Sequence, residues 1–380
     1  MIESNVAETK KNHAATIDTL RAIAILCVLA HHLFAYGGYQ LPYLDRNGGL
    51  IGLQLFFIIS GYLIIQSAMK YPLKVFVYHR FFRIFPPYLV ALSMFALAKY
   101  LTIDSYKSVM DARWPYFLLN LANLQFLHPV SILLLDSIHV GWSLTVELFW
   151  YAMAPVLVYL IGKSRHKEIS WIVALVLSVI ASTAWVYFAS RGWFNPMYEN
   201  SFRLAKVSVG NANLRHAFVD NAPPAQIVYF LIGACLFIFR RPLVKIPSSV
   251  LWPFSCAILL FVPLWNRDLG LFPNVLTGFG IAAFFLWIKL VGIHDQLTNW
   301  IAKVSYSIYL VHVPILLWVF NHWKLSGLFG LAVAILFIAV LAELSWRFVE
   351  VPSQRLGKRL TAKLHAGNLK TKIKPLLVTD

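Results

Sequence analysis

Ionisable residues recur at helical spacing within the first apolar stretch, residues 17–38. Arg21 and His32 are eleven positions apart, which is about three turns of α-helix, so they share a face about 16 Å apart along the axis. Asp18 precedes Arg21 by one turn and can pair with it. His31 projects about 100° away from His32. We therefore predict a helix with ionisable groups along one face.

Two arginines near residue 80 could bind an anion. Arg80 and Arg83 are three positions apart and share a helix face. Lys74 and His79 lie close in the sequence. Guanidinium groups bind phosphates through paired hydrogen bonds. The cluster therefore indicates either an orientation signal at the membrane surface or a cytoplasmic anion site.

Polar side chains also interrupt two later apolar stretches. Ser143 and Glu147 are four positions apart, and a carboxylate in such a helix must face protein or water and have a partner. Glu147 is therefore either paired with an arginine or takes a catalytic or orienting role. Ser305, Tyr309 and His312 share one helix face. They line a cavity or form packing hydrogen bonds.

One further pair of charges has the spacing of a structural ion pair. Glu343 and Arg347 are four positions apart, with the acid first. This order is the favourable one within a helix. We expect an internal ion pair there.

Composition identifies the class of protein that must position these groups. The chain has 380 residues, 59% hydrophobic and 13% charged, and a mean hydropathy of +0.67. A soluble protein would carry roughly 25% charged residues. We therefore predict an all-α polytopic membrane protein. The net charge of +17 is explained by basic cytoplasmic loops, so we expect no nucleic-acid partner.

Ten apolar stretches approach the roughly 20 residues needed to cross a bilayer. They are residues 17–37, 50–69, 84–103, 141–161, 169–190, 225–240, 249–265, 271–290, 300–320 and 327–349. Basic clusters at 10–11, 70–83, 163–167, 240–245 and beyond 355 are assigned to the cytoplasm. Both termini are then cytoplasmic, and residues 191–224 form the longest outer loop, which could cap the outer mouth.

The stretch 114–135 is apolar but contains Asn120, Asn123, Gln125 and Pro129. The charge pattern leaves it no room for a single crossing, so we expect it to re-enter the membrane or lie on its outer surface. Such broken backbone is tolerated where protein or a cavity surrounds it. An ordinary eleventh span is the alternative.

The histidines are scattered, and no cysteine–histidine spacing fits a metal site. We therefore predict no bound metal. Cys27, Cys235 and Cys256 all lie in apolar stretches. This odd number does not indicate a disulfide framework.

Several blocks together resemble one protein family. The stretch IDTLRAIAILCVLAHH is similar to the first-helix signature of the acyltransferase-three family of integral membrane proteins, in which an arginine precedes a histidine by eleven positions. This pattern selects Arg21 and His32, not His31. Later blocks resemble the family in the same order, from Ile17 to about Leu356. They are GLQLFFIISGYLI, RFFRIFPPY, GWSLTVELFWYAMAP, SYSIYLVHVPIL and RFVEVPSQRL.

The resemblance implies transfer of an acyl group, commonly acetyl, from cytoplasmic acyl-CoA to a glycan or another acceptor at the membrane. His32 matches the essential histidine of the first helix, and Arg21 matches its partner arginine. Arg80 and Arg83 match the paired-arginine motif on the donor side. Glu147 matches the carboxylate of the Trp-Ser-Leu-x-Val-Glu block.

The chain departs from the family pattern at three positions. Ala22 stands where glycine is frequent, Gln54 where the second block often has an acid, and Leu148 where a second acid often follows the first. Many relatives also have an extracytoplasmic hydrolase-like domain, and we expect none within these residues. The expected parts are a cytoplasmic polar tail (1–16), a transmembrane acyltransferase domain (17–354) and a basic cytoplasmic tail (355–380).

The leading hypothesis is O-acylation with His32 as general base, since a neutral imidazole accepts a proton near neutral pH. Glu147 or His312 would orient the imidazole, and a covalent acyl-histidine relay is a variant. The expected co-substrate is acetyl-CoA or another acyl-CoA, with no bound cofactor. Arg21, Arg80 and Arg83 would bind this donor, and Asp18, Ser143, Tyr309 and His312 would line the cavity.

Two rival functions are weighed against this hypothesis. Intramembrane ionisable groups also mark ion pathways, so a transporter or channel is the alternative, although no inverted repeat is found. A non-enzymatic assembly or regulatory protein is the third reading. The expected surroundings are membrane lipids of the plasma (bacterial inner) membrane and a surface polysaccharide or lipid-linked glycan acceptor. The sequence indicates neither the oligomeric state nor the acceptor's identity.

Overall fold

The computed structural model describes residues 2–194, 221–265, 273–291 and 295–368, together with residues 196 and 199. Helices dominate this part of the chain. The longer ones are α1 (Ile2–Gly37), α2 (Leu44–Lys70), α3 (Leu73–Thr102), α4 (Asp104–Leu121), α6 (Gly141–Gly162), α7 (Lys167–Ser190), α10 (Pro223–Ile238), α12 (Ser248–Trp265), α13 (Pro273–Val291), α14 (Gln296–Leu316), α15 (Gly327–Ser345) and α16 (Val351–Asn368). The shorter ones are η1 (Gln125–Leu127), α5 (Pro129–Leu133), α11 (Arg240–Leu243), η2 (Leu317–His322) and η3 (Trp346–Glu350).

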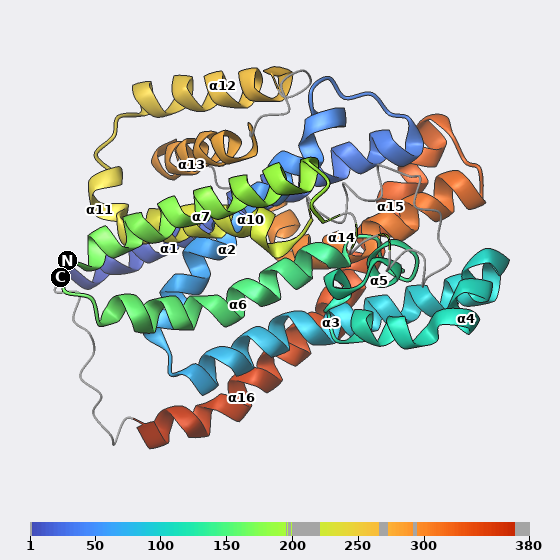
Figure 1. The fold of residues 1–380 in the computed structure, drawn as a ribbon, viewed down its shortest axis with the longest axis horizontal. Helices are drawn as coiled ribbons and strands as arrows, with labels where there is room; N and C mark the ends of the chain where they lie inside the picture. Colours follow the sequence, from blue (N-terminus) through green and yellow to red (C-terminus); the bar gives the residue numbers. More distant parts are fainter. Residues whose placement is uncertain are drawn as a thin grey trace.

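Within the described ranges, seven helices are long and apolar enough to cross a membrane, and three shorter apolar helices accompany them. Each of the ten predicted spans coincides with one of these helices. The all-α prediction is confirmed, and the chain is an integral membrane protein. Figure 1 shows α1, α6 and α7 running along the long axis, with α12 and α13 stacked on one side of them.

Helix α2 lies at the centre of the bundle and packs closely against α1 and α10. A Cβ atom at Gly61 would lie 2.1 Å from the carbonyl oxygen of Phe230, and one at Gly233 would lie 2.0 Å from that of Ile58. Small residues let the two backbones cross at this distance. Gly52 makes the same kind of contact with α1, so both neighbours of α2 are held tightly.

The stretch 114–135 does not form one long helix. Helix α4 has a non-helical residue at Arg113, and η1 and α5 follow after a turn. Buried polar side chains hold this turn: Asn120 Nδ2 donates to Ser131 O at 3.1 Å, and Thr145 Oγ1 donates to Asn123 Oδ1 at 3.2 Å. The predicted break is present, and the depth of the segment in the membrane stays a prediction.

Two π-helical segments interrupt the C-terminal helices. Helix α14 continues into η2, and α15 continues through η3 into α16. Single π turns are found often at functional sites. Helix α16 runs alongside α3 (Figure 1), where Ser353 Oγ donates to Phe82 O at 2.8 Å. Residues 355–368 of the predicted tail are therefore helical, and residues 369–380 lie outside the described part.

Glu343 and Arg347 pair as predicted, but their place in the fold differs from the expectation. Arg347 Nε lies 2.5 Å from Glu343 Oε1, yet the arginine side chain is 62% exposed. The pair is therefore at the surface of the bundle. The expected internal pair is wrong, because α15 turns this face outward.

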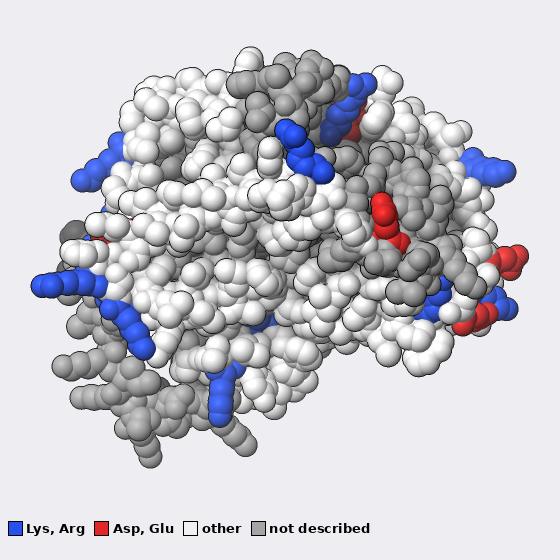
Figure 2. Space-filling model, viewed as in Figure 1, with Lys and Arg blue, Asp and Glu red and all other residues white. Residues whose placement is uncertain are grey.

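Charged side chains are sparse across the middle of the face in Figure 2. Lys and Arg are visible toward both ends of this face, whereas most of the visible Asp and Glu lie in its right half, so its left end is the more basic one. Such a polarity is typical of a protein whose basic end faces the cytoplasm. Most of the predicted outer loop, residues 191–224, falls outside the described residues.

Candidate active site

Two histidines from distant parts of the sequence meet where α1 packs against α14. His32 Nδ1 lies 3.2 Å from His312 Nε2, and the ring centroids are 4.9 Å apart. His32 Nδ1 is also 3.0 Å from Val28 O. His312 is fully buried, and its Nδ1 lies 2.8 Å from Tyr309 O.

The hydrogen bonds determine which nitrogen of each ring carries the proton. Carbonyl oxygens only accept, so His312 Nδ1, which faces the carbonyl of Tyr309, must be protonated. The Nε2 atom of a neutral His312 is then an acceptor. His32 Nδ1 faces this acceptor and Val28 O, so it carries the proton of its own ring. The free lone pair of neutral His32 is therefore on Nε2, where it can accept a proton.

His31 has a different environment. Its Nδ1 atom lies 2.7 Å from Asp45 O, and its ring contacts Gly49 of α2. It therefore packs against α2, and its ring also lies edge-on to the ring of His32, with 5.1 Å between the centroids. The contact with His312 is made by His32, and its role stays a prediction.

The predicted donor residues do converge on a single cavity. We name it the arginine cavity; it has a volume of about 90 Å³. Helices α1, α2, α3, α6 and α14 supply its walls. Its polar lining consists of Arg21, Ser60, Arg80, Arg83, Ser143, Glu147, Tyr151, Ser305, Tyr306 and Tyr309.

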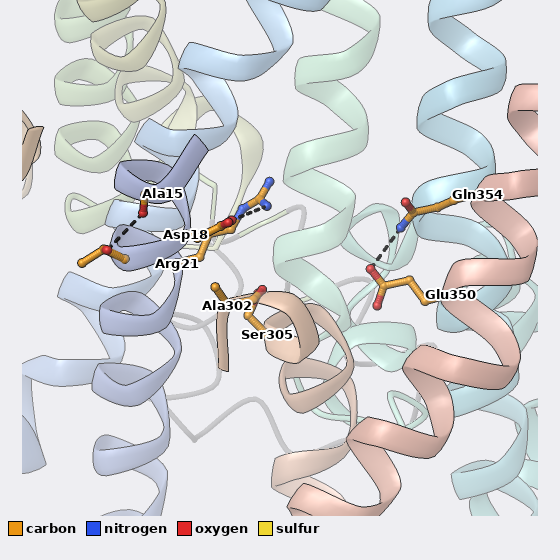
Figure 3. A network of polar contacts seen from close by, with 8 residues as sticks. Ala15, Asp18, Arg21, Ala302, Ser305, Glu350 and Gln354 are labelled. Atoms are coloured by element: carbon orange, nitrogen blue, oxygen red, sulfur yellow. Dashed lines mark hydrogen bonds and ion pairs between the residues drawn. The ribbon is translucent and has the colours of Figure 1, made fainter. Parts of the chain in front are cut away.

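Arg21 pairs with Asp18 as predicted, with 3.8 Å between Nη1 and Oδ1. Figure 3 shows Arg21 reaching from α1, and Glu350 from η3, toward the space between these helices. Arg83 also contributes to the electrostatic field at Arg21. Two arginines near each other leave positive charge that an anion can neutralise.

Arg80 presents a buried donor to the same cavity. Its Nε atom has no hydrogen-bond partner among the described residues. Its guanidinium lies over the rings of Phe76, at 5.7 Å, and Tyr151, at 5.9 Å. A buried donor without a partner costs free energy, so a ligand oxygen bound there would relieve this cost.

Glu147 lies in the arginine cavity, where Oε1 accepts hydrogen bonds from Ser60 Oγ at 2.8 Å and from Tyr151 at 2.6 Å. No described hydrogen bond joins it to His32. Of the two residues expected to orient the imidazole, His312 makes the contact. Through these two hydrogen bonds, Glu147 fixes the side chains of Ser60 and Tyr151 in the cavity wall.

Glu350 is a site residue that the sequence reasoning missed. It is 6% exposed, and its carboxylate accepts hydrogen bonds from Ser307 Oγ and Gln354 Nε2, each at 3.1 Å. The available signal was an acid inside the apolar block RFVEVP. The carboxylate also interacts electrostatically with Arg21 and Arg83. Its negative charge therefore balances part of the positive charge of the cavity.

Tyr309 connects the arginine cavity to the histidine pair. Its hydroxyl is 2.6 Å from Ser143 Oγ, and its ring centroid is 5.7 Å from that of His312. Of the four residues expected to line the cavity, Ser143 and Tyr309 are in its lining, whereas Asp18 and His312 are not. Among the residues that the structure describes, no group of three or more His, Cys, Asp or Glu could hold a metal ion.

Fold and site together define a polytopic membrane protein with a buried histidine contact and an arginine-lined cavity among its helices. The chain belongs to the acyltransferase 3 family: the family's acyltransferase domain matches residues 15–344. Similar proteins include the O-acetyltransferase OatA of Staphylococcus aureus, which is 25% identical over 92% of this chain. BcsY of Komagataeibacter xylinus, whose name is that of a membrane-bound transacylase, is 24% identical over 80% of this chain and 73% of its own length.

A further relative, from Staphylococcus aureus strain COL and named as an O-acetyltransferase, is 27% identical over 92% of this chain. The chain spans 58% of the length of this relative and of OatA. No solved structure gives a significant match.

Proposed function

We propose that the protein transfers an acyl group, with acetyl as the expected one, from acyl-CoA to a hydroxyl of a surface polysaccharide or lipid-linked glycan. The observation that carries the proposal is the base on His32 Nε2, left free by the hydrogen bonds of the histidine pair. Membership of the acyltransferase 3 family and the names of OatA and BcsY support acyl transfer.

The donor's phosphates bind near the three arginines of the arginine cavity. Arg80 Nε supplies a buried donor, and Arg21 and Arg83 supply further charge. This end of the bundle faces the cytoplasm in the proposed orientation, where acyl-CoA is made. The basic end of the face in Figure 2 supports that orientation.

His32 acts as the general base. Its Nε2 takes the proton from the acceptor hydroxyl while the hydroxyl oxygen attacks the thioester carbonyl. The carbon–sulfur bond then breaks, and the thiolate of coenzyme A takes the proton back from the imidazolium. Base catalysis of this kind contributes typically 10²–10⁴-fold.

His312 assists this step by its position. When His32 becomes an imidazolium, its Nδ1–H still donates to His312 Nε2 and Val28 O. Hydrogen bonds from charged donors are stronger than those from neutral ones. The pair therefore stabilises the charge that develops during proton transfer.

The test is acyl transfer in membrane vesicles that carry the full chain. The His32→Ala variant is expected to lose transfer, and His31→Ala, its matched neighbour, is expected to keep it. Labelled acetyl-CoA followed by mass spectrometry of membrane glycans measures both. Full transfer by His32→Ala would refute the proposal, and an acylated His32 trapped without acceptor would replace direct transfer with the relay.

A further inference from the structure

A second and larger cavity lies at the other end of α3. It has a volume of about 810 Å³, within the 300–1,000 Å³ typical of small-molecule sites. We name it the Lys99 cavity. The start of α4, the α5–α6 loop and η2 complete its wall, and its polar lining includes Lys99, Asp104, His139, Asn321 and His322.

The two cavities lie at different levels along α3 and α14. On α3, Lys99 follows Arg83 by sixteen residues, or about 24 Å. On α14, Tyr309 lines the arginine cavity and Pro314 lines the Lys99 cavity. His312 lies between these two positions on the same helix. A molecule in the Lys99 cavity thus lies at a different level of α14 from one in the arginine cavity.

The α5–α6 loop holds His139 at this cavity in a strained conformation. His139 has φ +61°, a left-handed value that costs a residue with a side chain free energy. Asp136 holds the loop, since its carboxylate accepts from Ile138 N at 3.2 Å and Gly141 N at 2.9 Å. A Cβ atom at Gly141 would lie 2.2 Å from Gln125 Nε2, so the loop has little room to relax. Strain of this kind is concentrated at functional sites.

His139 and Lys99 contact each other directly. His139 Nε2 lies 2.5 Å from Lys99 Nζ. An ammonium group can only donate a hydrogen bond, so the Nε2 atom of His139 that faces it carries no proton. The imidazole is then neutral and accepts a hydrogen bond from the ammonium. It orients Lys99 without neutralising it.

The lysine keeps its charge for a ligand. Among the described residues, no carboxylate oxygen lies within 4 Å of its Nζ. The charge of nearby Asp136 acts on Lys99, but the carboxylate oxygens accept from backbone N–H groups and form no ion pair with the ammonium. Asp104 also lines the cavity but is solvent-exposed at the start of α4.

The opposite wall offers an aromatic surface and hydrogen-bonding groups. The π-helical segment η2 contributes Trp318, Asn321 and His322. The ring centroid of Trp318 is 6.0 Å from that of Phe95, which holds the indole at the wall. Aromatic surface with a few polar groups is typical of sites that bind small organic molecules.

We propose that the Lys99 cavity binds the acceptor, and that this acceptor is a sugar bearing an acidic group which the Lys99 ammonium contacts. This inference rests on the proposed function, because the acceptor is the molecule that receives the acyl group in that reaction. The binding itself needs no turnover. It can therefore be tested separately from catalysis.

The test compares two disaccharides that differ in one group: cellobiose, and glucuronosyl-glucose, which has a carboxylate in place of one hydroxymethyl. Binding to the purified full chain is measured by saturation-transfer NMR. We expect tighter binding of the acidic sugar, and a loss of about tenfold to a hundredfold in its affinity in Lys99→Met. Lys107→Met, a change at an exposed lysine of α4 outside the cavity lining, is the matched control.

A second variant guards against a folding defect. Lys99→Arg keeps the charge and should retain the preference for the acidic sugar, and acetyl-CoA binding reports an intact bundle in each variant. Equal affinity of wild type and Lys99→Met for the acidic sugar would overturn the proposal, as would no binding of either sugar. If His32→Ala keeps full transfer while Lys99 still selects the acidic sugar, only the proposed catalytic function fails.

Discussion

Replacing His312 tests whether the histidine pair works as a unit. His312→Phe keeps a planar ring in the buried site but removes the Nε2 acceptor 3.2 Å from His32 Nδ1. His312→Gln retains an acceptor at the end of a side chain of similar reach. Neither change touches the arginine cavity, because His312 is not part of its lining.

The magnitude follows from the charge on His32 during the reaction. A hydrogen bond between neutral groups contributes about 0.5–1.5 kcal/mol, and one to a charged group about 1.5–3 kcal/mol. The difference of about 1–1.5 kcal/mol is the stabilisation gained only when the imidazolium forms. Removing it should lower kcat by about tenfold. Because Val28 O still accepts from His32 Nδ1 at 3.0 Å, the loss should be smaller than that of His32→Ala.

The assay is the initial rate of transfer from labelled acetyl-CoA to membrane glycans in vesicles, with acetyl-CoA varied. His312→Phe should lower kcat and leave KM for acetyl-CoA near the wild-type value. His312→Gln should recover most of the rate. In the His32→Ala background, His312→Phe should cause little further loss, since two residues that act as a unit are not additive. Equal rates for the Phe and Gln variants, or a change confined to KM, would show that His312 only packs the helix.

Three further predictions concern the arginine cavity, the α5–α6 loop and the packing of α2. Arg80→Met removes the buried hydrogen-bond donor Nε and should raise KM for acyl-CoA about tenfold, with a smaller effect on kcat. Arg165→Met, a change outside the cavity, should match wild type. An unchanged KM in Arg80→Met would exclude Arg80 from binding the acyl donor. Burial raises the pKa of Asp136 from 3.8 to about 6, so folding favours the protonated carboxyl. The free energy of unfolding that this preference contributes is complete below about pH 4. It is lost as the pH rises through 6. Thermal unfolding should therefore show wild type losing up to about 3 kcal/mol over this range relative to Asp136→Asn, and parallel pH profiles would contradict the assignment. Gly233→Ala places a Cβ atom 2.0 Å from Ile58 O and should destabilise the bundle by about 1–3 kcal/mol. Leu328→Ala, at a side chain that is 84% exposed, should leave the stability unchanged. Equal melting temperatures of Gly233→Ala and wild type would show that α2 and α10 can move apart freely.

The sequence predicted the crossing helices well because each depends on local composition. An apolar stretch of about 20 residues has few stable alternatives in a bilayer. The break near Asn120 and Asn123 was also predictable, since these amides are costly within a lipid-exposed helix. The surface position of Arg347 was not, because spacing indicates a pair but not which way the helix face turns.

The site was predictable to the extent that its residues share a helix. Arg21 and His32 follow from helical phase on α1, and Arg80 and Arg83 from phase on α3. The contact between His32 and His312 joins residues 280 positions apart, so no local pattern indicates it. The same is true of Lys99 and His139, whose contact depends on a left-handed residue that has no glycine to mark it.

We propose that the order of residues along α14 lets one helix couple the two substrates. Tyr309 lines the arginine cavity, His312 contacts the base, and Pro314 lines the Lys99 cavity. Pro314 follows Tyr309 by five positions, or about 7.5 Å of helix. In the proposed function, a donor and an acceptor on opposite sides of this helix turn would approach the same imidazole through separate entrances. The bundle would then keep the two pools of substrate apart and still bring an acyl carbon and a hydroxyl together at His32.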